Sequence, residues 1–473
     1  MIQIIMIVCY LLLTITISLI STKRARNSTS SFYVAGRSMP AIVVAALLFS
    51  EIIAGSGTIG NAQNAYSGGL SNAVWANWGM ALGCFLVLVT VSKFYRAMAA
   101  KYNAMTIPQA YAVMFGPKVR VLMVFIVALA YIIMYSTQAP AAATILSPLL
   151  GLDEKMITWL ITIFFIVVAI TGGMVGASWI GVVHTAVMFI GMLFVCVHAV
   201  KSVGGLKLMH AALPAGYFSV IGAQPMTTLA SALGTAISFL ASSNVTTALF
   251  GSKDYRAANR GILIAGCAVI PFALLPAFIG MSSKLALPGI KASGALFQMA
   301  NSLGAVSSGA LSMAIIAAIW STAPTLLIII SATLTKDFYL TKIKPSASER
   351  QQLRFSYLVI AVAGIAGTWM GQNAGSILNN MLGAFQIRSI VGIVLLAALA
   401  WPRVNSRSAF WSMLCGGAVA AVWFFAGSPF SVAPLWPGSA VCLAVLIPLT
   451  LANRDKVSDG YAKYSEAKKL VLR

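Results

Sequence analysis

The stretch PAIVVAALLFSEIIAGSGTIGNA (Pro40–Ala62) decides the fold. It is long enough to cross a bilayer, which takes about 20 apolar residues, but AGSGT (54–58) interrupts it. A second apolar stretch, 226–250, is interrupted by Gly234 and by ASSN (241–244). Small and hydroxyl residues can also serve close helix packing. Because two membrane segments carry such interruptions, we favour broken helices, whose unwound backbone exposes carbonyl groups that can bind a cation.

Composition places the whole chain in the membrane. Of 473 residues, 60% are hydrophobic and 8% are charged, and the mean hydropathy is +0.92. Soluble domains carry about 25% charged residues, so the composition excludes a soluble enzyme, a fibrous protein and a disordered chain. The net charge of +22 does not indicate nucleic-acid binding, because the basic residues form short clusters between apolar runs, as in cytoplasmic loops. The chain is a polytopic all-α membrane protein.

The apolar runs predict thirteen transmembrane helices. They cover approximately residues 2–20, 40–62, 73–92, 119–147, 156–172, 179–200, 226–250, 261–283, 304–335, 353–371, 376–400, 407–427 and 434–452. With the N-terminus outside and the C-terminus inside, the inner segments hold 25 basic residues and the outer segments hold five. The positive-inside rule therefore favours this orientation.

The spans group into two sets of five with opposite topology. Residues 40–200 form the first set and 226–400 the second, and the third member of each set is unusually long. This pattern predicts a five-plus-five inverted-repeat transporter core. Residues 1–39, a first span and cytoplasmic loop, and 401–473, two spans and a basic tail, flank the core. We expect the tail to lie near anionic lipid headgroups.

No pattern of catalytic or metal-binding residues stands out. The six cysteines lie inside apolar runs without a CxxC pair or a nearby histidine at ligand spacing, so we assign them no disulfide or metal role. There is no His/Asp/Cys cluster and no appended soluble output domain. We therefore expect no enzyme activity and no catalytic residues, and we disfavour a membrane solute sensor or a lipid-modifying enzyme.

Several motifs resemble those of the sodium:solute symporter family. They are FYVAGRSMP (Phe32–Pro40), YSGGL (Tyr66–Leu70), TIPQAYAVMFG (Thr106–Gly116), ITGGMVGASW (Ile170–Trp179) and STAPTLLIIISATLTKDFY (Ser321–Tyr339). The matches run from about residue 32 to 410, in order and at the family's spacing. The resemblance implies transport of a small organic solute driven by sodium.

The resemblance also implies one sodium site between the second and ninth spans. Its expected ligands are the carbonyl groups of Ser50, Ile53 and Ala318 and the hydroxyl groups of Ser321 and Thr322. A neutral cage of five oxygens suits a hard monovalent cation that must be released again. Serine and threonine in membrane helices more often bond to their own backbone, but the A-x-x-S-T spacing in its full context favours the sodium role.

The chain departs from the family pattern at three places. The family's double-glycine motif usually continues Trp-Thr-Asp, whereas Gly181 stands here at the carboxylate position, so we expect one sodium per cycle. A Gln-Arg pair at the end of span seven is replaced by Thr247-Ala248. A glutamine common on span six is His184, to which we assign no role.

Away from the span ends, where basic residues are counted with the inner segments, the predicted spans contain one acidic and one basic residue, Glu51 and Arg388. A charge at the bilayer centre costs about 2.5–3.5 kcal/mol on insertion scales, so each marks a candidate functional site. Three readings remain open: a Glu51–Arg388 charge pair, which we favour slightly; a substrate carboxylate on Arg388; and a protonatable Glu51. Further candidates for substrate binding or coupling are the residues of the two interruptions, Ser56, Gly57, Ser242 and Asn244.

We expect a secondary active transporter of the plasma membrane (the inner membrane of a bacterial cell) that couples sodium to symport of a small organic solute by alternating access. Proton coupling through Glu51 is the alternative within transport. The expected partners are the solute, one sodium ion and the lipid bilayer, with no nucleic acid and no obligate protein partner. The sequence does not identify the solute, because the lining positions are mostly small, apolar and hydroxyl residues.

Overall fold

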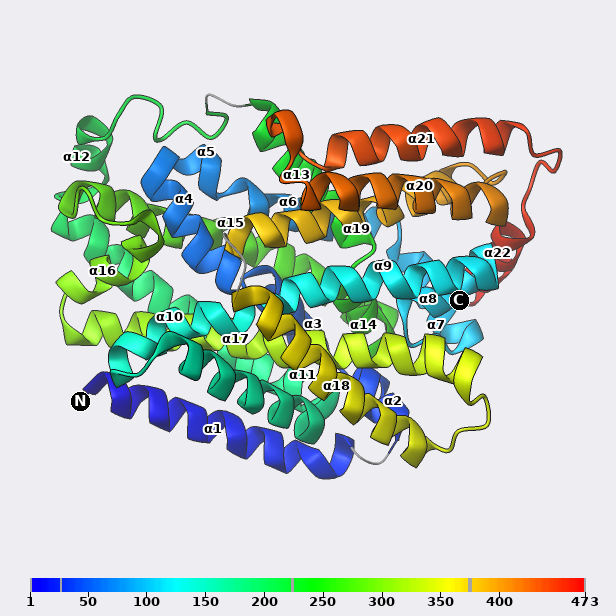
Figure 1. Cartoon of the computed structure of the whole chain (residues 1–473), viewed down its shortest axis with the longest axis horizontal. Coiled ribbons are helices and arrows are strands. Elements are labelled where there is room, and N and C mark those ends of the chain that lie inside the picture. Colours follow the sequence, from blue (N-terminus) through cyan, green and yellow to red (C-terminus); the bar gives the residue numbers. More distant parts are fainter. Residues whose placement is uncertain (1, 26–27, 223–224, 373–376, 472–473) are drawn as a thin grey trace.

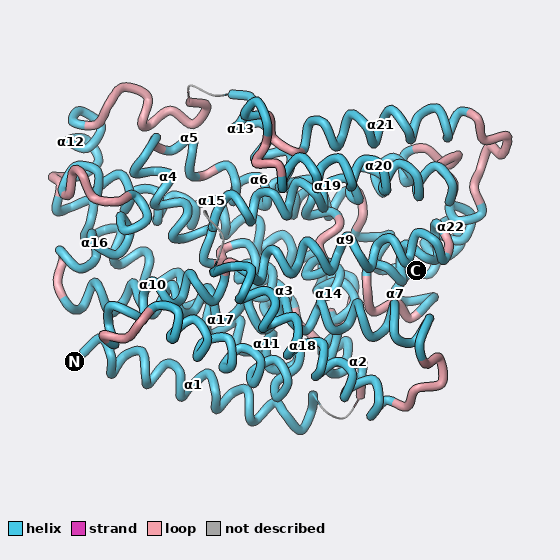
Figure 2. The backbone as a smooth tube through the Cα atoms, viewed as in Figure 1, coloured by secondary structure: helices cyan, strands magenta, loops and turns pink. Residues whose placement is uncertain are grey.

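The structure, a computed structural model, describes residues 2–25, 28–222, 225–372 and 377–471. Within these residues every regular element is a helix, and the only β feature is an isolated bridge between Met39 and Ser252 (Figure 2). Eight helices in this part of the chain are long and apolar enough to cross a membrane, or nine if one pair bent by 57° counts as a span. The all-α membrane fold is confirmed, while the count of thirteen spans and the orientation stay predictions.

The first half of the chain carries the first broken helix and the longest helix (Figure 1). Its elements are α1 (Ile2–Ala25), α2 (Thr29–Val34), η1 (Ala35–Arg37), α3 (Ala41–Ile52), η2 (Ser56–Gly60), α4 (Asn61–Gly68), α5 (Leu70–Ala73), α6 (Trp75–Val89), α7 (Ser92–Tyr102), α8 (Ile107–Phe115), α9 (Pro117–Ser136), α10 (Gln138–Leu150), α11 (Glu154–Ser202) and α12 (Gly205–Ala212). The bent pair is α6 and α7.

The second half carries the second broken helix and the last, peripheral helices. Its elements are α13 (Pro225–Leu240), α14 (Ser243–Gly251), α15 (Tyr255–Ala286), η3 (Ala292–Gly294), α16 (Ala295–Ser302), α17 (Ala305–Thr333), η4 (Leu334–Ile343), α18 (Glu349–Gln372), α19 (Ile377–Ala400), α20 (Ser406–Phe425), η5 (Pro429–Ser431), α21 (Leu435–Leu451) and α22 (Asp459–Val471).

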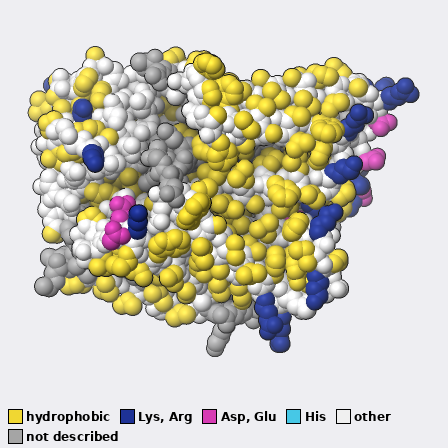
Figure 3. Space-filling view, in the orientation of Figure 1, with side chains coloured by type: hydrophobic (Ala, Val, Ile, Leu, Met, Phe, Trp, Pro, Cys, Tyr) yellow, Lys and Arg dark blue, Asp and Glu magenta, His cyan; other side chains and the backbone are white. Residues whose placement is uncertain are grey.

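Helix α17 lies in the interior of the bundle, almost entirely buried, where it packs against α11, α1, α9 and α18. The outer helices instead expose large apolar side chains, among them Phe125, Leu358, Trp369 and Val422. Figure 3 shows a band of hydrophobic side chains across the face of the molecule, with most of the visible Lys and Arg at the end where the C-terminus lies in Figure 1. This distribution suits a protein surrounded by lipid and bordered by basic residues on one side.

Both interruptions in the sequence contain a break in the structure, although Gly234, which we assigned to the second, lies inside α13. Helix α3 ends at Ile52, and Ile53 leaves helical geometry with φ −94° and ψ 20° before the chain resumes in η2. Helix α13 ends at Leu240, and Ser242 is extended with φ −77° and ψ 131°. Ser242 then caps α14, its hydroxyl oxygen accepting from the backbone N–H groups of Asn244 and Val245. The two breaks leave backbone groups free of the helical hydrogen-bond pattern inside the protein.

The fifth and sixth predicted spans meet more abruptly than the sequence indicates. We expected a short loop over residues 173–178, but the only non-helical residue inside α11 is Gly173, with φ 51° and ψ −160°. A straight helix of 49 residues would be about 74 Å long, far beyond the bilayer core. Gly173 divides it because glycine adopts this backbone geometry without steric cost.

The C-terminal tail folds onto the protein itself. Helix α22 packs against α7 and α8, with the rings of Tyr464 and Phe94 5.5 Å apart. A Cβ atom at Gly460 would lie 1.7 Å from the carbonyl oxygen of Met114, so the two backbones are in close contact. We expected the tail to lie near the lipid headgroups and did not predict its contact with α7 and α8. Charge alone does not reveal that Tyr464 and Ala467 are buried.

Candidate functional site

The expected sodium ligands of α3 and α17 meet at the end of α3. The hydroxyl of Thr322 donates to the carbonyl oxygen of Ser50 at 2.8 Å, across two helices that are 272 residues apart in sequence. It also lies 3.0 Å from the carbonyl oxygen of Ala318, to which the hydroxyl of Ser321 donates at 2.9 Å. Four of the five expected ligand residues are thus linked by hydrogen bonds.

The fifth, Ile53, is fully buried at the first non-helical position after α3. Its N–H donates to the carbonyl of Phe49, while its own carbonyl belongs to the end of α3, where carbonyl groups lack helical partners. Ser50, Ser321 and Thr322 are buried as well. The region offers neutral oxygen atoms in a dry surrounding, which is the chemistry that suits a sodium ion. The hydroxyl protons are turned toward Ala318 and Ser50, so their oxygen lone pairs are available for a cation.

Gly57 and Asn77 stabilise the first break. The side-chain amide of Asn77, on α6, donates to the carbonyl oxygen of Gly57 at 3.2 Å. A Cβ atom at position 57 would lie 2.9 Å from the carbonyl oxygen of Ile52, closer than real Cβ atoms approach, and 3.0 Å from Oδ1 of Asn77, which is also tight. Gly57 is therefore required by space. The side chains of Ser56 and Glu51 lie outside the described residues.

Arg388, on α19, is completely buried beside the second break. Its Nε donates to the hydroxyl of Ser238 on α13 at 2.8 Å, and its Nη1 donates to the hydroxyl of Tyr131 on α9 at 2.8 Å. The rings of Tyr131 and Phe385 lie 5.3 and 5.2 Å from the guanidinium carbon. Three helices therefore fix the guanidinium in one orientation.

Tyr131 connects Arg388 to the break. The backbone N–H of Ser243, the first residue of α14, donates to the Tyr131 hydroxyl at 2.6 Å, and the Ser242 hydroxyl lies 3.4 Å from the same oxygen. The candidates Ser242 and Arg388 thus share one neighbour. Asn244 follows in α14, buried, and its side-chain amide has no hydrogen-bond partner within the described residues.

Several neighbours of the site were missed by sequence reasoning. Tyr131, Ser238 and Asn77 are ordinary residues of apolar helices, and only the folded structure places them beside Arg388 or Gly57. His184 is buried against the ring of Tyr10, with a centroid distance of 5.5 Å, and both its nitrogens lack partners in the described part of the chain. His184 therefore belongs to the contact between α11, on which it lies, and α1.

A cavity of about 1130 Å³ lies between the first two turns of α13, residues 382–386 of α19, the ends of α9 and α18, and the α20–α21 connection. The orientation predicted from charge places it on the outer side. Gln386 contributes to its lining, two positions before Arg388, and is itself almost buried. Arg388 lies about 200° around α19 from Gln386, so its side chain leaves the helix on a different side and is not part of this lining.

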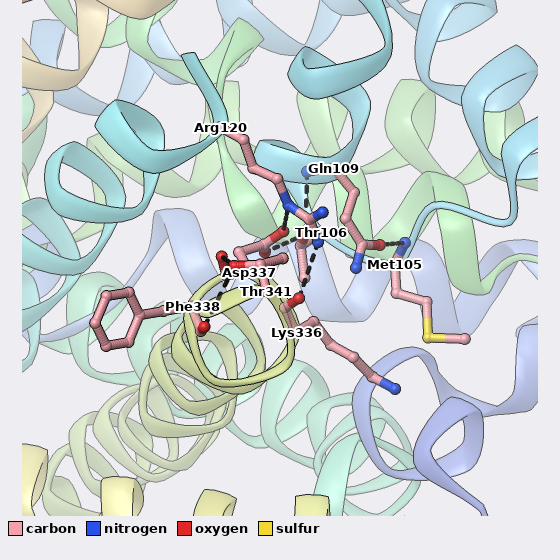
Figure 4. A network of polar contacts seen from close by, with 8 residues as sticks. All are labelled: Met105, Thr106, Gln109, Arg120, Lys336, Asp337, Phe338 and Thr341. Atoms are coloured by element: carbon pink, nitrogen blue, oxygen red, sulfur yellow. Dashed lines mark hydrogen bonds and ion pairs between the residues drawn. The ribbon is translucent and has the colours of Figure 1, made fainter. Parts of the chain in front are cut away.

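At the basic end of the molecule, a buried carboxylate is paired with an arginine. Figure 4 shows the buried carboxylate of Asp337 between Arg120 of α9 and Thr106, the residue that caps α8. Nε of Arg120 lies 2.7 Å from Oδ1 of Asp337, and the Thr106 hydroxyl donates to Oδ2 at 2.5 Å. Arg120 Nη2 also donates to the carbonyl of Lys336 at 2.8 Å. This network ties η4 to α8 and α9, beside a cavity of about 650 Å³.

Comparison with solved structures shows which class of fold the molecule has. Among solved structures, the fold superposes on a sodium-coupled sialic acid symporter with a TM-score of 0.82 at 17% identity, covering 96% of this chain and 97% of that one. It also superposes on Mhp1, a nucleobase-cation-symport-1 family transporter, with a TM-score of 0.61 at 17% identity, covering 92% and 98%. The molecule therefore has the fold of a secondary transporter.

The family follows from sequence. Residues 32–416 match the sequence pattern of the sodium:solute symporter family, so the chain belongs to this family. Curated relatives include the high-affinity proline transporter PutP of Bacillus subtilis, 24% identical over 94% of this chain and 97% of the relative. The sodium/proline symporter of Haemophilus influenzae is 21% identical over 94% and 93%. The family resemblance read from the motifs is confirmed.

Proposed function

We propose that this protein is a sodium-coupled symporter that carries a small organic solute across the plasma membrane by alternating access. The observation that carries the proposal is the hydrogen bond from Thr322 to the carbonyl of Ser50, which joins the broken end of α3 to α17. Membership of the sodium:solute symporter family supports sodium as the coupling ion. The same family membership supports transport, rather than an enzymatic reaction, as the activity of the protein.

The proposed sodium ligands are the carbonyl oxygens of Ser50, Ile53 and Ala318 and the hydroxyl oxygens of Ser321 and Thr322. Sodium would replace the hydrogen bonds that now join these groups with ion–oxygen contacts. The site lies at the contact between the two proposed repeats, residues 40–200 and 226–400, so an ion there would favour one arrangement of the repeats over the other.

We propose a single sodium ion per cycle. The position where many family members carry a carboxylate is Gly181, whose Cβ would lie 3.9 Å from the backbone of Ala46 and Leu47 in α3. A side chain there would face α3, and glycine supplies no oxygen to it. Thr325, one turn from Ser321, donates its hydroxyl to the Ser321 carbonyl at 3.0 Å instead.

The experiment measures sodium binding without knowledge of the solute. Thermal unfolding of the purified full-length protein is compared in NaCl and in KCl of equal ionic strength. Sodium should raise the unfolding temperature, because a ligand that binds only the native state stabilises it. Ser321→Ala and Thr322→Ala should each raise the half-saturating sodium concentration roughly tenfold, the effect of losing one contact worth ~1.5 kcal/mol.

Ser331→Ala is the matched control. Ser331 is also buried on α17, and its hydroxyl donates to a carbonyl three residues earlier, Ile328, at 2.8 Å. It lies about 15 Å along the helix from Ser321, so its loss should leave the sodium response unchanged. Equal behaviour of all three variants, or no difference between sodium and potassium in the unaltered protein, would contradict the assignment. A response to pH in place of sodium would support coupling through Glu51.

A further inference from the structure

The charge of Arg388 is not balanced by any described acidic side chain. Within the described residues the ion pairs are Arg120–Asp337 and Lys101–Glu466, and neither involves α19. A buried charge without a partner of opposite sign costs several kcal/mol in desolvation. Ionisable residues inside the membrane usually mark substrate or ion sites. We therefore expect an anionic ligand to balance the charge of Arg388.

Two of the three guanidinium nitrogens of Arg388 are hydrogen-bonded to hydroxyl groups, and the third is not. Nε and Nη1 are bound to Ser238 and Tyr131, whereas Nη2 is buried and has no hydrogen-bond partner in the described part of the chain. An arginine presents its N–H groups in a fixed planar fork, so two occupied nitrogens determine where the third points. Nη2 is therefore an oriented donor with no protein acceptor.

A second source of positive potential lies next to Arg388. Helix α14 begins at Ser243, and the N-terminus of a helix carries a partial positive charge. The N–H of Ser243 and Nη1 of Arg388 donate to the same Tyr131 oxygen, so the helix end and the guanidinium are adjacent. The buried Ser243 hydroxyl also lacks a partner among the described residues. Half-helix termini of this kind face anionic substrate groups in transporters.

The same environment disfavours other solute classes. A solute that carries only an amine would be repelled by Arg388, and a neutral sugar would leave its charge unbalanced. A phosphate dianion would need a second cation, and among the described residues Arg388 is the one basic side chain that is hydrogen-bonded to Tyr131 and Ser238 beside the break. A carboxylate carries one negative charge and accepts strong hydrogen bonds from a guanidinium, so it can balance the charge of Arg388 and accept from Nη2.

We propose that the transported solute bears a carboxylate, and that this carboxylate binds Nη2 of Arg388 beside the α13–α14 break. The proposal rests on the proposed function as a solute symporter and specifies its substrate class. The solute would then complete the buried charge during transport.

The test uses matched pairs of probes that differ only in charge. Thermal unfolding of the full-length protein in saturating NaCl is measured with L-proline, L-alanine and L-lactate, with the corresponding amides, and with D-glucose. At least one carboxylate should raise the unfolding temperature, with an apparent affinity about tenfold or more above that of its amide. Equal stabilisation by the amide or by glucose, or no stabilisation by any carboxylate, overturns the proposal.

Variants locate the effect. Arg388→Gln should abolish the carboxylate-dependent shift, and Arg388→Lys, which keeps the charge without the planar fork, should restore part of it. If Arg388→Gln does not fold, Ser238→Ala replaces it, because it removes only the acceptor that orients Nε; the affinity for the carboxylate should fall while that for the amide stays. Retention of full carboxylate affinity in the folded variants contradicts the proposal. Loss of the sodium response in the unaltered protein would instead reject the proposed function itself.

Discussion

Arg120, at the basic end, and Arg388, at the α13–α14 break, differ in how their charge is balanced. Arg120 lies 2.7 Å from the buried carboxylate of Asp337, which also accepts from Thr106. Arg388 is more deeply buried and has only neutral neighbours in the described structure. The charge of Arg120 is balanced within the protein, whereas the region of the α13–α14 break retains polar atoms without partners in the described structure, among them Arg388 Nη2 and the Asn244 amide. We infer that the transported solute supplies the partner that Arg388 lacks in the described structure.

The largest expected effect comes from breaking the network at the basic end. Arg120→Gln should cost about 3–5 kcal/mol of stability, because it leaves the Asp337 carboxylate buried without a cation. Adding Asp337→Asn should recover most of the loss. Arg350→Gln, on an exposed residue, is the control and should change little. Thermal unfolding measures all four proteins, and additive losses in the double variant would contradict the balanced pair.

A smaller effect is expected at the first break. Gly57→Ala should cost about 1–3 kcal/mol and reduce solute uptake, because the added Cβ would press on the Ile52 carbonyl and on Asn77. Gly181→Ala is the matched control, since its Cβ would have no neighbour closer than 3.9 Å. Unfolding temperature and uptake into proteoliposomes decide between them. A Gly57→Ala protein that equals Gly181→Ala in both measurements would mean that the break tolerates a side chain.

Double substitution separates the open readings of the two intramembrane charges. If Glu51 and Arg388 formed a pair, Glu51→Gln together with Arg388→Gln would recover part of the loss caused by either change. Carboxylate binding by Arg388 predicts instead that the double variant transports no better than Arg388→Gln alone. The measurement is uptake at several solute concentrations. Partial recovery would favour the pair, and a flattened pH profile in Glu51→Gln would favour a proton site.

The smallest effect is expected for the exposed Lys101–Glu466 ion pair of the tail. The hydrogen bond from Lys101 lowers the pKa of Glu466, so any stabilisation is present above the carboxyl's unfolded pKa and is lost as the pH falls through the lowered value. Because the pair is exposed, Glu466→Gln should leave the unfolding temperature unchanged near neutral pH. Gly460→Leu should separate α22 from α8, since Gly460 touches the Met114 backbone. A larger loss in Glu466→Gln than in Gly460→Leu would show that charge, not packing, holds α22.

The sequence predicted what depends on local chemistry. Runs of small and hydroxyl residues located both helix breaks, because such residues tolerate non-helical backbone, and a single arginine in an apolar run marked Arg388. It missed what depends on distant contacts, such as Tyr131 joining Arg388 to Ser243 and the docking of Tyr464 on Phe94. It also replaced the one-residue break at Gly173 by a loop, since hydropathy does not report backbone angles. The roles assigned to the site residues remain predictions.

Sodium-coupled flux tests the central claim most directly. Proteoliposomes containing the full-length protein receive a radiolabelled carboxylate that stabilises it, together with ²²Na⁺, and the two fluxes are counted in the same vesicles. We predict solute-dependent sodium entry at a ratio near one. Thr322→Ala should need roughly tenfold more sodium for half-maximal entry, whereas Ser331→Ala should behave like the unaltered protein. A ratio near two would reject the single sodium site. Solute uptake that is indifferent to sodium would contradict the proposed coupling altogether.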